Sequence, residues 1–296
     1  MKNVLVFGGF GFLGYYLLKE LLSRNYQITV ADIQDNDEFK NILNYKKCDI
    51  LDEIEVASIF ENQSFDIVYN LAGFANLDLA IKTPVKTMQL NILGNMNILE
   101  ACVANNIKKF IYASSAYAMS NKGSFYGISK LASEKIIEEY HEKYNLDFTI
   151  LRYGSVYSER EYDNNYIYNI VKKAVLENLI DHNGDGNEIR EYIHAADAAK
   201  LSVDVIESDN FKNIHVILTG PERIKRAELF EMINEILNHK LEVRYKINQY
   251  QNHYKFTPYS FEPSLSRKLT LNPHIDMGQG LLECIRSVYN NENQYN

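Results

Sequence analysis

The stretch Val4-Leu5-Val6-Phe7-Gly8-Gly9-Phe10-Gly11-Phe12-Leu13-Gly14 decides the fold class. Its first four residues form a continuous apolar run, as expected of a strand that is covered on both faces. Glycines follow where a helix begins: Gly8 permits a tight turn, Gly11 lets the backbone approach a pyrophosphate, and Gly14 lets the helix pack on the strand. The N–H groups of the helix N-terminus favour phosphate. This pattern indicates a dinucleotide-binding loop.

Outward from this loop, β-rich runs alternate with longer amphipathic segments. The expected strands are Val4–Phe7, Gln27–Ala31, Tyr45–Cys48, Asp66–Leu71, Lys109–Ala113 and Asp147–Arg152. Apolar residues recur at helical spacing in Leu13–Arg24, Glu53–Glu61, Pro84–Asn105 and Tyr126–Tyr144. Because parallel strands need right-handed crossover connections, the alternation predicts an α/β fold with a doubly wound parallel Rossmann sheet.

The alternation becomes less regular after Arg152. We expect a helix near Tyr166–Glu177 and a Gly/Asp/Asn-rich turn region over His182–Arg190. Two further α/β pieces are expected, Ile214–Thr219 before Ala227–Asn238 and Leu241–Tyr245 before a Pro-containing tail. The sequence thus predicts a first domain over residues 1–155 and a smaller C-terminal lobe over 156–296, with some segments returning to the first domain.

Composition limits the possible partners. The chain has 296 residues and a formal net charge of −8, which would repel a polyanion, so we expect no nucleic-acid partner. Cys48, Cys102 and Cys284 match no metal-binding spacing, so we expect reduced thiols and no metal. We find no leader-like segment and no run of about 18 apolar residues, so a cytoplasmic protein without a membrane partner is expected.

An acidic residue marks the end of the second strand. Asp32 follows Gly14 by 18 residues, where a carboxylate can accept hydrogen bonds from the ribose of adenosine. The same carboxylate would repel a 2′-phosphate. We therefore expect NAD, rather than NADP, as the cofactor.

A tyrosine and a lysine four residues apart open a later helix. Residues i and i+4 share a helix face, so the Lys130 ammonium can lie near the Tyr126 hydroxyl. A cation about 5 Å away at an effective dielectric near 20 is worth about 3 kcal/mol, or roughly two pKa units. That brings Tyr126 towards neutrality as a base for a hydroxyl proton. Just upstream, Ser115 could hold the reacting oxygen, whereas Ser114 is expected to satisfy backbone groups at the strand end.

Together these motifs resemble the extended short-chain dehydrogenases/reductases of the nucleotide-sugar epimerase and dehydratase group. The resemblance spans nearly the whole chain. Beyond the glycine loop and the Tyr/Lys pair it includes Cys48-Asp49-Ile50, Asn70-Leu71-Ala72-Gly73, Asn91-Ile92-Leu93-Gly94, Arg152-Tyr153-Gly154-Ser155-Val156-Tyr157 and the segment Gly184–His194.

The resemblance implies further roles. It implies that residues 1–155 bind NAD and that 156–296 mainly bind a nucleotide sugar. The catalytic residues it implies are Tyr126, Lys130 and Ser115. The cofactor contacts it implies are Gly8, Gly11, Phe12, Leu13, Gly14, Asp32, Asp49, Ile50, Leu71, Ala72, Gly73, Asn91, Tyr126, Lys130 and Tyr153. The substrate contacts it implies are Ser115, Ser155 and Arg190, with Asp197 as a helix cap. The two long helices are expected to pair across a two-fold axis in a homodimer.

Departures from the family pattern narrow the chemistry. Relatives that dehydrate the sugar carry an Asp–Glu pair after the catalytic hydroxyl residue, where this chain has Ala116 and Tyr117. Decarboxylating relatives keep a glutamate there. Without these proton carriers, neither dehydration nor decarboxylation is expected.

Two reactions remain open: oxidation of a sugar hydroxyl and 4-epimerisation through a transient ketone. Only ten residues separate Ser115 from Tyr126, which indicates a shortened loop over the substrate. Met119, Ser155 and Asn70 also replace frequent family residues. We favour oxidation at C4 with release of the product, in outline similar to capsule-pathway dehydrogenases that act on a GDP-linked heptose. A non-catalytic NAD sensor is the other class, and the retained Tyr/Lys pair argues against it.

Overall fold

The computed structural model describes residues 2–39, 42–120, 122–163, 165–238, 241–246, 253 and 266–293. These residues form two compact units, which are treated separately below. The first takes in residues 2–153, 199–217 and 266–268, and the second takes in the other described residues. The first unit ends at residue 153 before the second begins, and two later segments of the chain belong to the first unit again.

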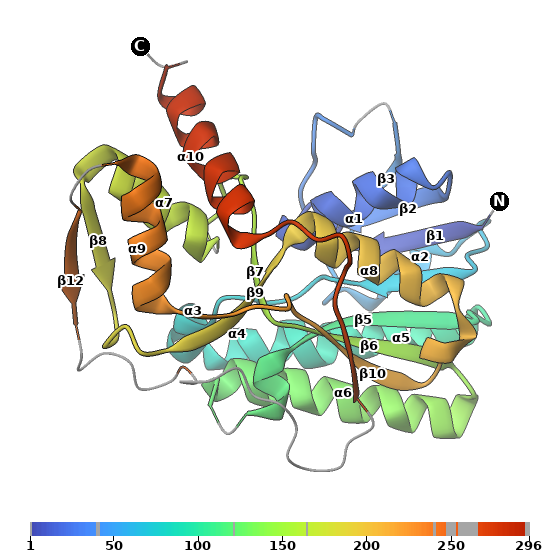
Figure 1. Cartoon of the computed structure of the whole chain (residues 1–296). Coiled ribbons are helices and arrows are strands. Elements are labelled where there is room, and N and C mark those ends of the chain that lie inside the picture. Colours follow the sequence, from blue (N-terminus) through green and yellow to red (C-terminus); the bar gives the residue numbers. More distant parts are fainter. Residues whose placement is uncertain are drawn as a thin grey trace. The chain divides into compact units, whose positions relative to one another are not determined.

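A doubly wound sheet forms the centre of the first unit (Figure 1). In the described residues its strand order is β13-β10-β6-β5-β4-β1-β2-β3. The strands are β1 (Asn3–Phe7), β2 (Gln27–Asp32), β3 (Asn44–Lys47), β4 (Ile67–Asn70), β5 (Lys109–Ser115), β6 (Asp147–Tyr153), β10 (Ile214–Leu218) and β13 (Ser266–Leu269). From β3 to β6 every neighbouring pair is parallel, which confirms the predicted fold class.

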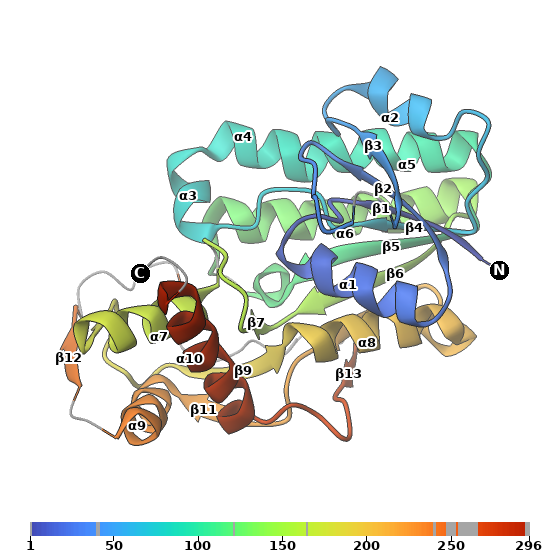
Figure 2. The ribbon, with the colours of Figure 1, turned by 90° about the horizontal axis from the view of Figure 1, so that it is seen from above.

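Helices cover both faces of this sheet. They are α1 (Phe12–Ser23), α2 (Glu53–Ile59), α3 (Leu77–Lys82), α4 (Pro84–Met88), α5 (Gly94–Ala104), α6 (Ser124–Tyr144) and most of α8 (Ala195–Glu207). Short helical turns are η1 (Gln89–Leu93), η2 (Ala116–Met119) and η3 (Asp209–Phe211). Figure 2 shows α5 and α6 on one face, with α1 and α8 on the other. Because both faces are covered, the side chains of a central strand are buried on either side, and Val4–Phe7 are all 0% exposed.

The strand order places the predicted cofactor loop at a switch point. β1 lies between β4 and β2, so the chain leaves its carboxyl end towards opposite sides of the sheet. Ligands of open α/β sheets bind outside the strand ends at such a point. The glycine loop follows β1 and Asp32 ends β2, so both lie at this edge.

The expected single helix Pro84–Asn105 is interrupted. Its middle, η1, is a π-helical turn between α4 and α5. Such a turn inserts one extra residue into the helical hydrogen-bond pattern and is common at functional sites. Apolar periodicity alone cannot reveal it, because one extra residue leaves the apolar pattern almost unchanged. Asn91, whose contacts are described below, lies in this turn.

The second unit contains two small sheets and several helices. One sheet has the order β11-β9-β7 and the other pairs β12 with β8 in parallel. Its elements are β7 (Ser155–Tyr157), α7 (Tyr166–Glu177), β8 (Leu179–His182), β9 (Ile189–His194), β11 (Arg223–Lys225), α9 (Arg226–Leu237), β12 (Glu242–Tyr245) and α10 (Met277–Asn293). The expected turn region over His182–Arg190 is therefore shorter than predicted, since β8 ends and β9 begins within it. α10 was not expected from the sequence, and its buried residues pack into the apolar core of this unit.

Candidate active site

The glycine loop is shaped for a close backbone approach. Gly8 has φ +73°, and a β-carbon there would lie 2.5 Å from the Ala72 nitrogen. A β-carbon on Gly14 would collide with the carbonyl oxygens of Gly8 and Gly9. Gly11 is extended and precedes the first turn of α1. Because no side chain fits at Gly8 or Gly14, the loop presents backbone to the space beyond β1, as a pyrophosphate requires.

Asp32 is tied to this loop. One carboxylate oxygen accepts a hydrogen bond from Phe10 N–H at 3.0 Å, and the other accepts one from Gln34 N–H at 3.1 Å. Burial raises the pKa of Asp32, although these backbone donors oppose the shift. The acid at the end of β2 therefore shares the edge of the sheet with the glycine loop, where it was predicted to meet a ribose.

The other implied cofactor contacts surround the same edge. Leu71, Ala72 and Gly73 follow β4, and Leu71 N–H donates to the Phe7 carbonyl at 2.9 Å. Asp49 and Ile50 follow β3, with the side chain of Ile50 buried. Phe12 and Leu13 begin α1.

Asn91 connects three segments of the site from the π turn. Its side chain, 2% exposed, accepts a hydrogen bond from Phe74 N–H at 2.6 Å and donates to the Phe74 carbonyl at 3.0 Å. It also donates to the Ser129 hydroxyl at 2.8 Å, and Ser129 donates to the Tyr126 carbonyl at 2.8 Å. Its own carbonyl accepts from Ser133 at 2.6 Å. In this structure Asn91 therefore positions the loop after Gly73 and the first turns of α6.

The three predicted catalytic residues come from β5 and α6. Ser115 ends β5, and its oxygen accepts a hydrogen bond from Tyr117 N–H at 3.2 Å. Tyr126 lies in the first turn of α6, and its ring packs edge-on against Tyr117 at 6.0 Å between centroids. Both Ser115 and Tyr126 are buried, at 7% and 8% exposed. In the sequence, Tyr117 was notable only because it stands where dehydrating relatives carry an acid. In the structure it contacts both Ser115 and Tyr126.

Lys130 is a buried cation. It is 6% exposed, donates to the Ala113 carbonyl at 2.7 Å, and places its ammonium 4.8 Å from the centre of the Tyr112 ring. Burial lowers its pKa to about 8, and the charge of Glu134 opposes that shift. A pKa of about 8 still leaves the ammonium as the main form at pH 7. The positive charge assumed for activation of Tyr126 is therefore present.

Two further candidates belong to the second unit. Ser155 begins β7 and pairs with Tyr192 of β9. Arg190 lies in β9 at 2% exposed, and its guanidinium donates to the Ile189 carbonyl at 2.9 Å. Tyr153 ends β6 in the first unit, and its hydroxyl forms a hydrogen bond of 2.7 Å with the Ser202 hydroxyl.

Two expectations about polar residues are wrong. Ser114 was expected to satisfy backbone groups, but its hydroxyl donates to the Glu134 carboxylate across to α6. Asp197 was expected to cap a helix, but α8 begins earlier, at Ala195. His194 precedes the helix, and its Nδ1 accepts Ala196 N–H at 3.3 Å. Asp197 instead accepts Ile275 N–H at 2.8 Å, which joins α8 to the chain before α10.

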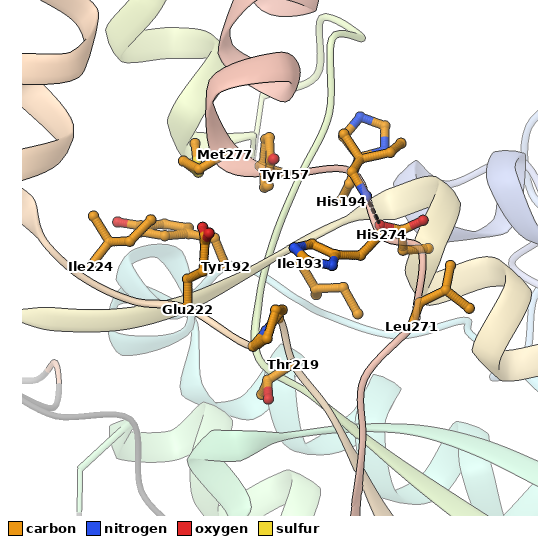
Figure 3. Close-up of a pocket in the computed structure, with 14 residues that line it drawn as sticks. Tyr157, Tyr192, Ile193, His194, Thr219, Glu222, Ile224, Leu271, His274 and Met277 are labelled. Carbon is orange, nitrogen blue, oxygen red and sulfur yellow. Dashed lines mark hydrogen bonds between the residues drawn. The ribbon is translucent and has the colours of Figure 1, made fainter.

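A small pocket lies in the second unit (Figure 3). Tyr157, Thr219 and His274 are among its lining residues, and its cavity of about 10 Å³ has room for a single water molecule. Tyr157 and Thr219 are at most 1% exposed, and their hydroxyls have no hydrogen-bond partner in the described part of the chain. A pocket this small does not accommodate a nucleotide sugar.

Within the described residues, the side chains of Glu159, His194 and Glu283 come within 4.8 Å of one another. Because Nδ1 of His194 accepts a backbone hydrogen bond, its Nε2 carries the hydrogen and points to Glu159 at 3.2 Å. A metal ion would need that nitrogen without its proton. We assign the cluster to packing of the second unit.

No helix in the described ranges has the length and apolar content to cross a membrane.

Comparisons with known proteins agree with this geometry. The model of the "NAD dependent epimerase/dehydratase family" matches residues 4–218. The UDP-glucuronate 4-epimerase of Thermodesulfobacterium geofontis is 25% identical over 324 residues, covering 97% of this chain and 99% of that protein. The family description names NAD, which confirms the cofactor expected from Asp32.

Solved structures give the same answer for the fold. The UDP-N-acetylglucosamine 4-epimerase of Methanobrevibacter ruminantium M1, in complex with UDP-N-acetylmuramic acid, is 25% identical with a TM-score of 0.80, covering 98% of this chain and 99% of that one. The UDP-glucuronic acid 4-epimerase of Bacillus cereus, with UDP-glucuronic acid and NAD, is 21% identical with a TM-score of 0.84, covering 97% and 99%. At 21% identity, the second likeness concerns the fold alone.

Proposed function

Because the chain belongs to the NAD dependent epimerase/dehydratase family, we propose that it oxidises the C4 hydroxyl of a nucleotide-linked sugar. The observation that carries this proposal is the grouping of Ser115, Tyr126 and a buried Lys130 at the carboxyl end of β5. Each of these groups has a role in removing a hydroxyl proton, and a module that only binds NAD does not need all three together.

Tyr126, Lys130 and Ser115 together remove the proton of the substrate's C4 hydroxyl. Tyr126 is the base, since the charge of Lys130 on the same helix face favours its phenolate. The Ser115 oxygen already accepts from Tyr117 N–H, so its own hydrogen is available to the substrate oxygen. When bound, NAD supplies the hydride acceptor. The glycine loop and Asp32 would hold the cofactor's phosphates and ribose at the switch point of the sheet.

We propose 4-epimerisation as the complete reaction, with a UDP-linked sugar as the substrate. Two full-length relatives carry such names: a UDP-glucuronate 4-epimerase and a UDP-N-acetylglucosamine 4-epimerase. The absence of an acid at Ala116 and Tyr117 fits, because epimerisation needs no proton carrier for water loss. Ala116 is buried and the Tyr117 ring packs on Tyr126, so neither place offers a substitute acid.

The second candidate is the dehydrogenase favoured by the sequence, which releases the 4-ketone. The observation that favours it is the short connection between Ser115 and Tyr126, in which η2 is followed within a few residues by α6. A GDP-linked heptose, as in capsule pathways, belongs to this candidate. Arg190 and Ser155 of the second unit are the proposed substrate contacts in either case.

Mass spectrometry separates the two candidates. The protein is incubated with UDP-hexoses, UDP-uronic acids and GDP-heptoses, and the products are compared with the substrates. We expect a product of unchanged mass and altered retention, without accumulation of NADH. Loss of two hydrogens with stoichiometric NADH would establish the dehydrogenase instead. Loss of water would contradict the argument from Ala116 and Tyr117, and no turnover of any sugar would favour the NAD sensor.

We also propose a homodimer, which the family resemblance implies. In the first unit, an apolar surface groove is lined by Pro84, Val85, Met88, Gln89, Ile92, Leu93 and Phe125. On the same helices Val85 is 69% exposed, Leu93 is 52% and Ile128 is 58%. A second copy would cover this face. Sedimentation equilibrium tests it: Leu93→Glu should shift the protein from dimer to monomer, and a monomeric wild type would refute it.

A further inference from the structure

A buried carboxylate lies on α6 one turn beyond Lys130. Glu134 is 0% exposed. Its Oε1 accepts hydrogen bonds from the Ser114 hydroxyl and from Nε of Arg152 at 2.9 Å, while its Oε2 accepts from Nη2 of Arg152 at 2.6 Å. Ser114 belongs to β5 and Arg152 to β6. One side chain therefore joins α6 to two neighbouring strands of the sheet.

Glu134 holds residues that are direct neighbours of the candidate active site. Ser114 stands between Ala113, whose carbonyl accepts the Lys130 ammonium, and Ser115, which faces the reacting oxygen in the proposed reaction. Lys130 itself lies four residues before Glu134, on the same face of α6. The end of β5 is thus held to α6 at two consecutive residues, Ala113 and Ser114.

We propose that Glu134 is a positioning residue for the catalytic lysine. It fixes the end of β5 against α6, so that the Ala113 carbonyl meets the Lys130 ammonium, and its negative charge helps to keep that ammonium protonated. The consequence for catalysis rests on the function proposed above, whereas the effect on Lys130 does not.

The electrostatic surroundings support this role. Lys130 faces the Tyr112 ring and the Ala113 carbonyl from β5, and Glu134 from its own helix. Burial lowers the pKa of Lys130 to about 8, and the coulombic effect of Glu134 opposes this shift. Removal of the Glu134 charge should therefore lower the pKa of Lys130 further, towards the pH at which the enzyme must work.

Three groups lie around the Glu134 carboxylate. Arg152 of β6 is its counter-charge and Ser114 of β5 is a neutral donor. His215 of β10 lies 3.7 Å from Oε2, and burial lowers the pKa of His215 to about 4, so it is neutral at pH 7. His215 also lies 3.1 Å from Glu138, one turn further along α6. Glu138 is therefore a matched acidic control on the same helix.

A purely structural ion pair makes a different prediction. Replacing both members of a buried ion pair with well-packed hydrophobic residues of similar volume is often neutral or stabilising, whereas removing one member leaves an uncompensated charge and costs several kcal/mol. Glu134→Gln could fail to fold for that reason alone. The double variant Glu134→Gln/Arg152→Gln removes both charges together, and it still takes the negative charge away from Lys130.

The test measures Lys130 directly in the NAD-loaded protein without substrate. Acetic anhydride acetylates only the neutral amine, and peptide mass spectrometry follows acetylation of Lys130 from pH 6 to pH 10. In Glu134→Gln and in the double variant we expect the midpoint to fall by at least about half a pH unit. Glu138→Gln should leave it unchanged. With a turned-over nucleotide sugar, kcat at pH 8 should fall about ten-fold while KM changes less than about two-fold.

The outcomes are distinguishable. An unchanged Lys130 midpoint in the double variant would refute the positioning role and leave Glu134 as a structural ion pair. If Glu134→Gln does not fold, the double variant decides alone. A lowered midpoint in a protein whose wild type turns over no nucleotide sugar would support the role of Glu134 while the proposed function fails.

Discussion

Lys130→Met should make the protein more stable at pH 7 while it removes activity. The structure gives Lys130 a pKa of about 8, compared with 10.5 for an exposed lysine. A difference of about 2.5 units corresponds to about 3 kcal/mol. Because the folded-state pKa is depressed, this cost of burying the ammonium is fully present below pH 8 and disappears as the pH rises towards 10.5. Lys130 is 6% exposed, so solvent screening does not reduce it greatly.

Methionine removes the buried charge but also the hydrogen bond to the Ala113 carbonyl, which is worth about 1 kcal/mol. The net gain at pH 7 is therefore about 2 kcal/mol. Wild type recovers most of its disadvantage by pH 10, so the difference between the two proteins should change by roughly 2.5 kcal/mol between pH 7 and pH 10. At pH 10 little of the cost of burying the ammonium remains. If the hydrogen bond to the Ala113 carbonyl is then worth more than that remaining cost, wild type becomes the more stable of the two proteins.

Urea unfolding of the cofactor-free protein, followed by far-ultraviolet circular dichroism at both pH values, measures this change. Lys135→Met is the matched control, since Lys135 is an exposed lysine of the same helix whose ammonium lies 2.8 Å from the Glu138 carboxylate. That variant should show no pH-dependent difference of this size. If the difference in the free energy of unfolding between Lys130→Met and wild type is the same at pH 7 and pH 10, the lowered pKa of Lys130 in the folded protein is refuted.

Two further predictions concern the base and the cofactor. Tyr126→Phe should lower turnover about 10²–10⁴-fold with little change in the NAD dissociation constant, which calorimetry and steady-state kinetics measure; near-normal turnover would exclude Tyr126 as the base. Asp32→Ala should reduce a preference of at least about ten-fold for NAD over NADP, mainly by weakening NAD, because its carboxylate no longer bonds the ribose. Equal affinities of the wild type for the two cofactors would contradict that role.

Residues whose role is local in the chain could be predicted from the sequence. The glycine loop, Asp32 and the Tyr126/Lys130 pair depend on strand ends, helix starts and i, i+4 spacing, all of which follow from periodicity over a few residues. The structure places each of them on the expected element at the expected edge of the sheet. The interrupted helix at Asn91 was missed, because the extra residue leaves the apolar pattern almost unchanged.

What only the tertiary structure decided is how the catalytic lysine is held and charged. The acceptor of Lys130 is a backbone carbonyl of β5, 17 residues earlier, and backbone atoms carry no sequence signal. Glu134 follows Lys130 by four residues, the same spacing that separates Lys130 from Tyr126. Its contacts with Ser114 and Arg152, however, join α6 to β5 and β6, which only folding brings together. The pKa of a side chain depends on how much water its neighbours exclude, and that is a property of packing rather than of composition.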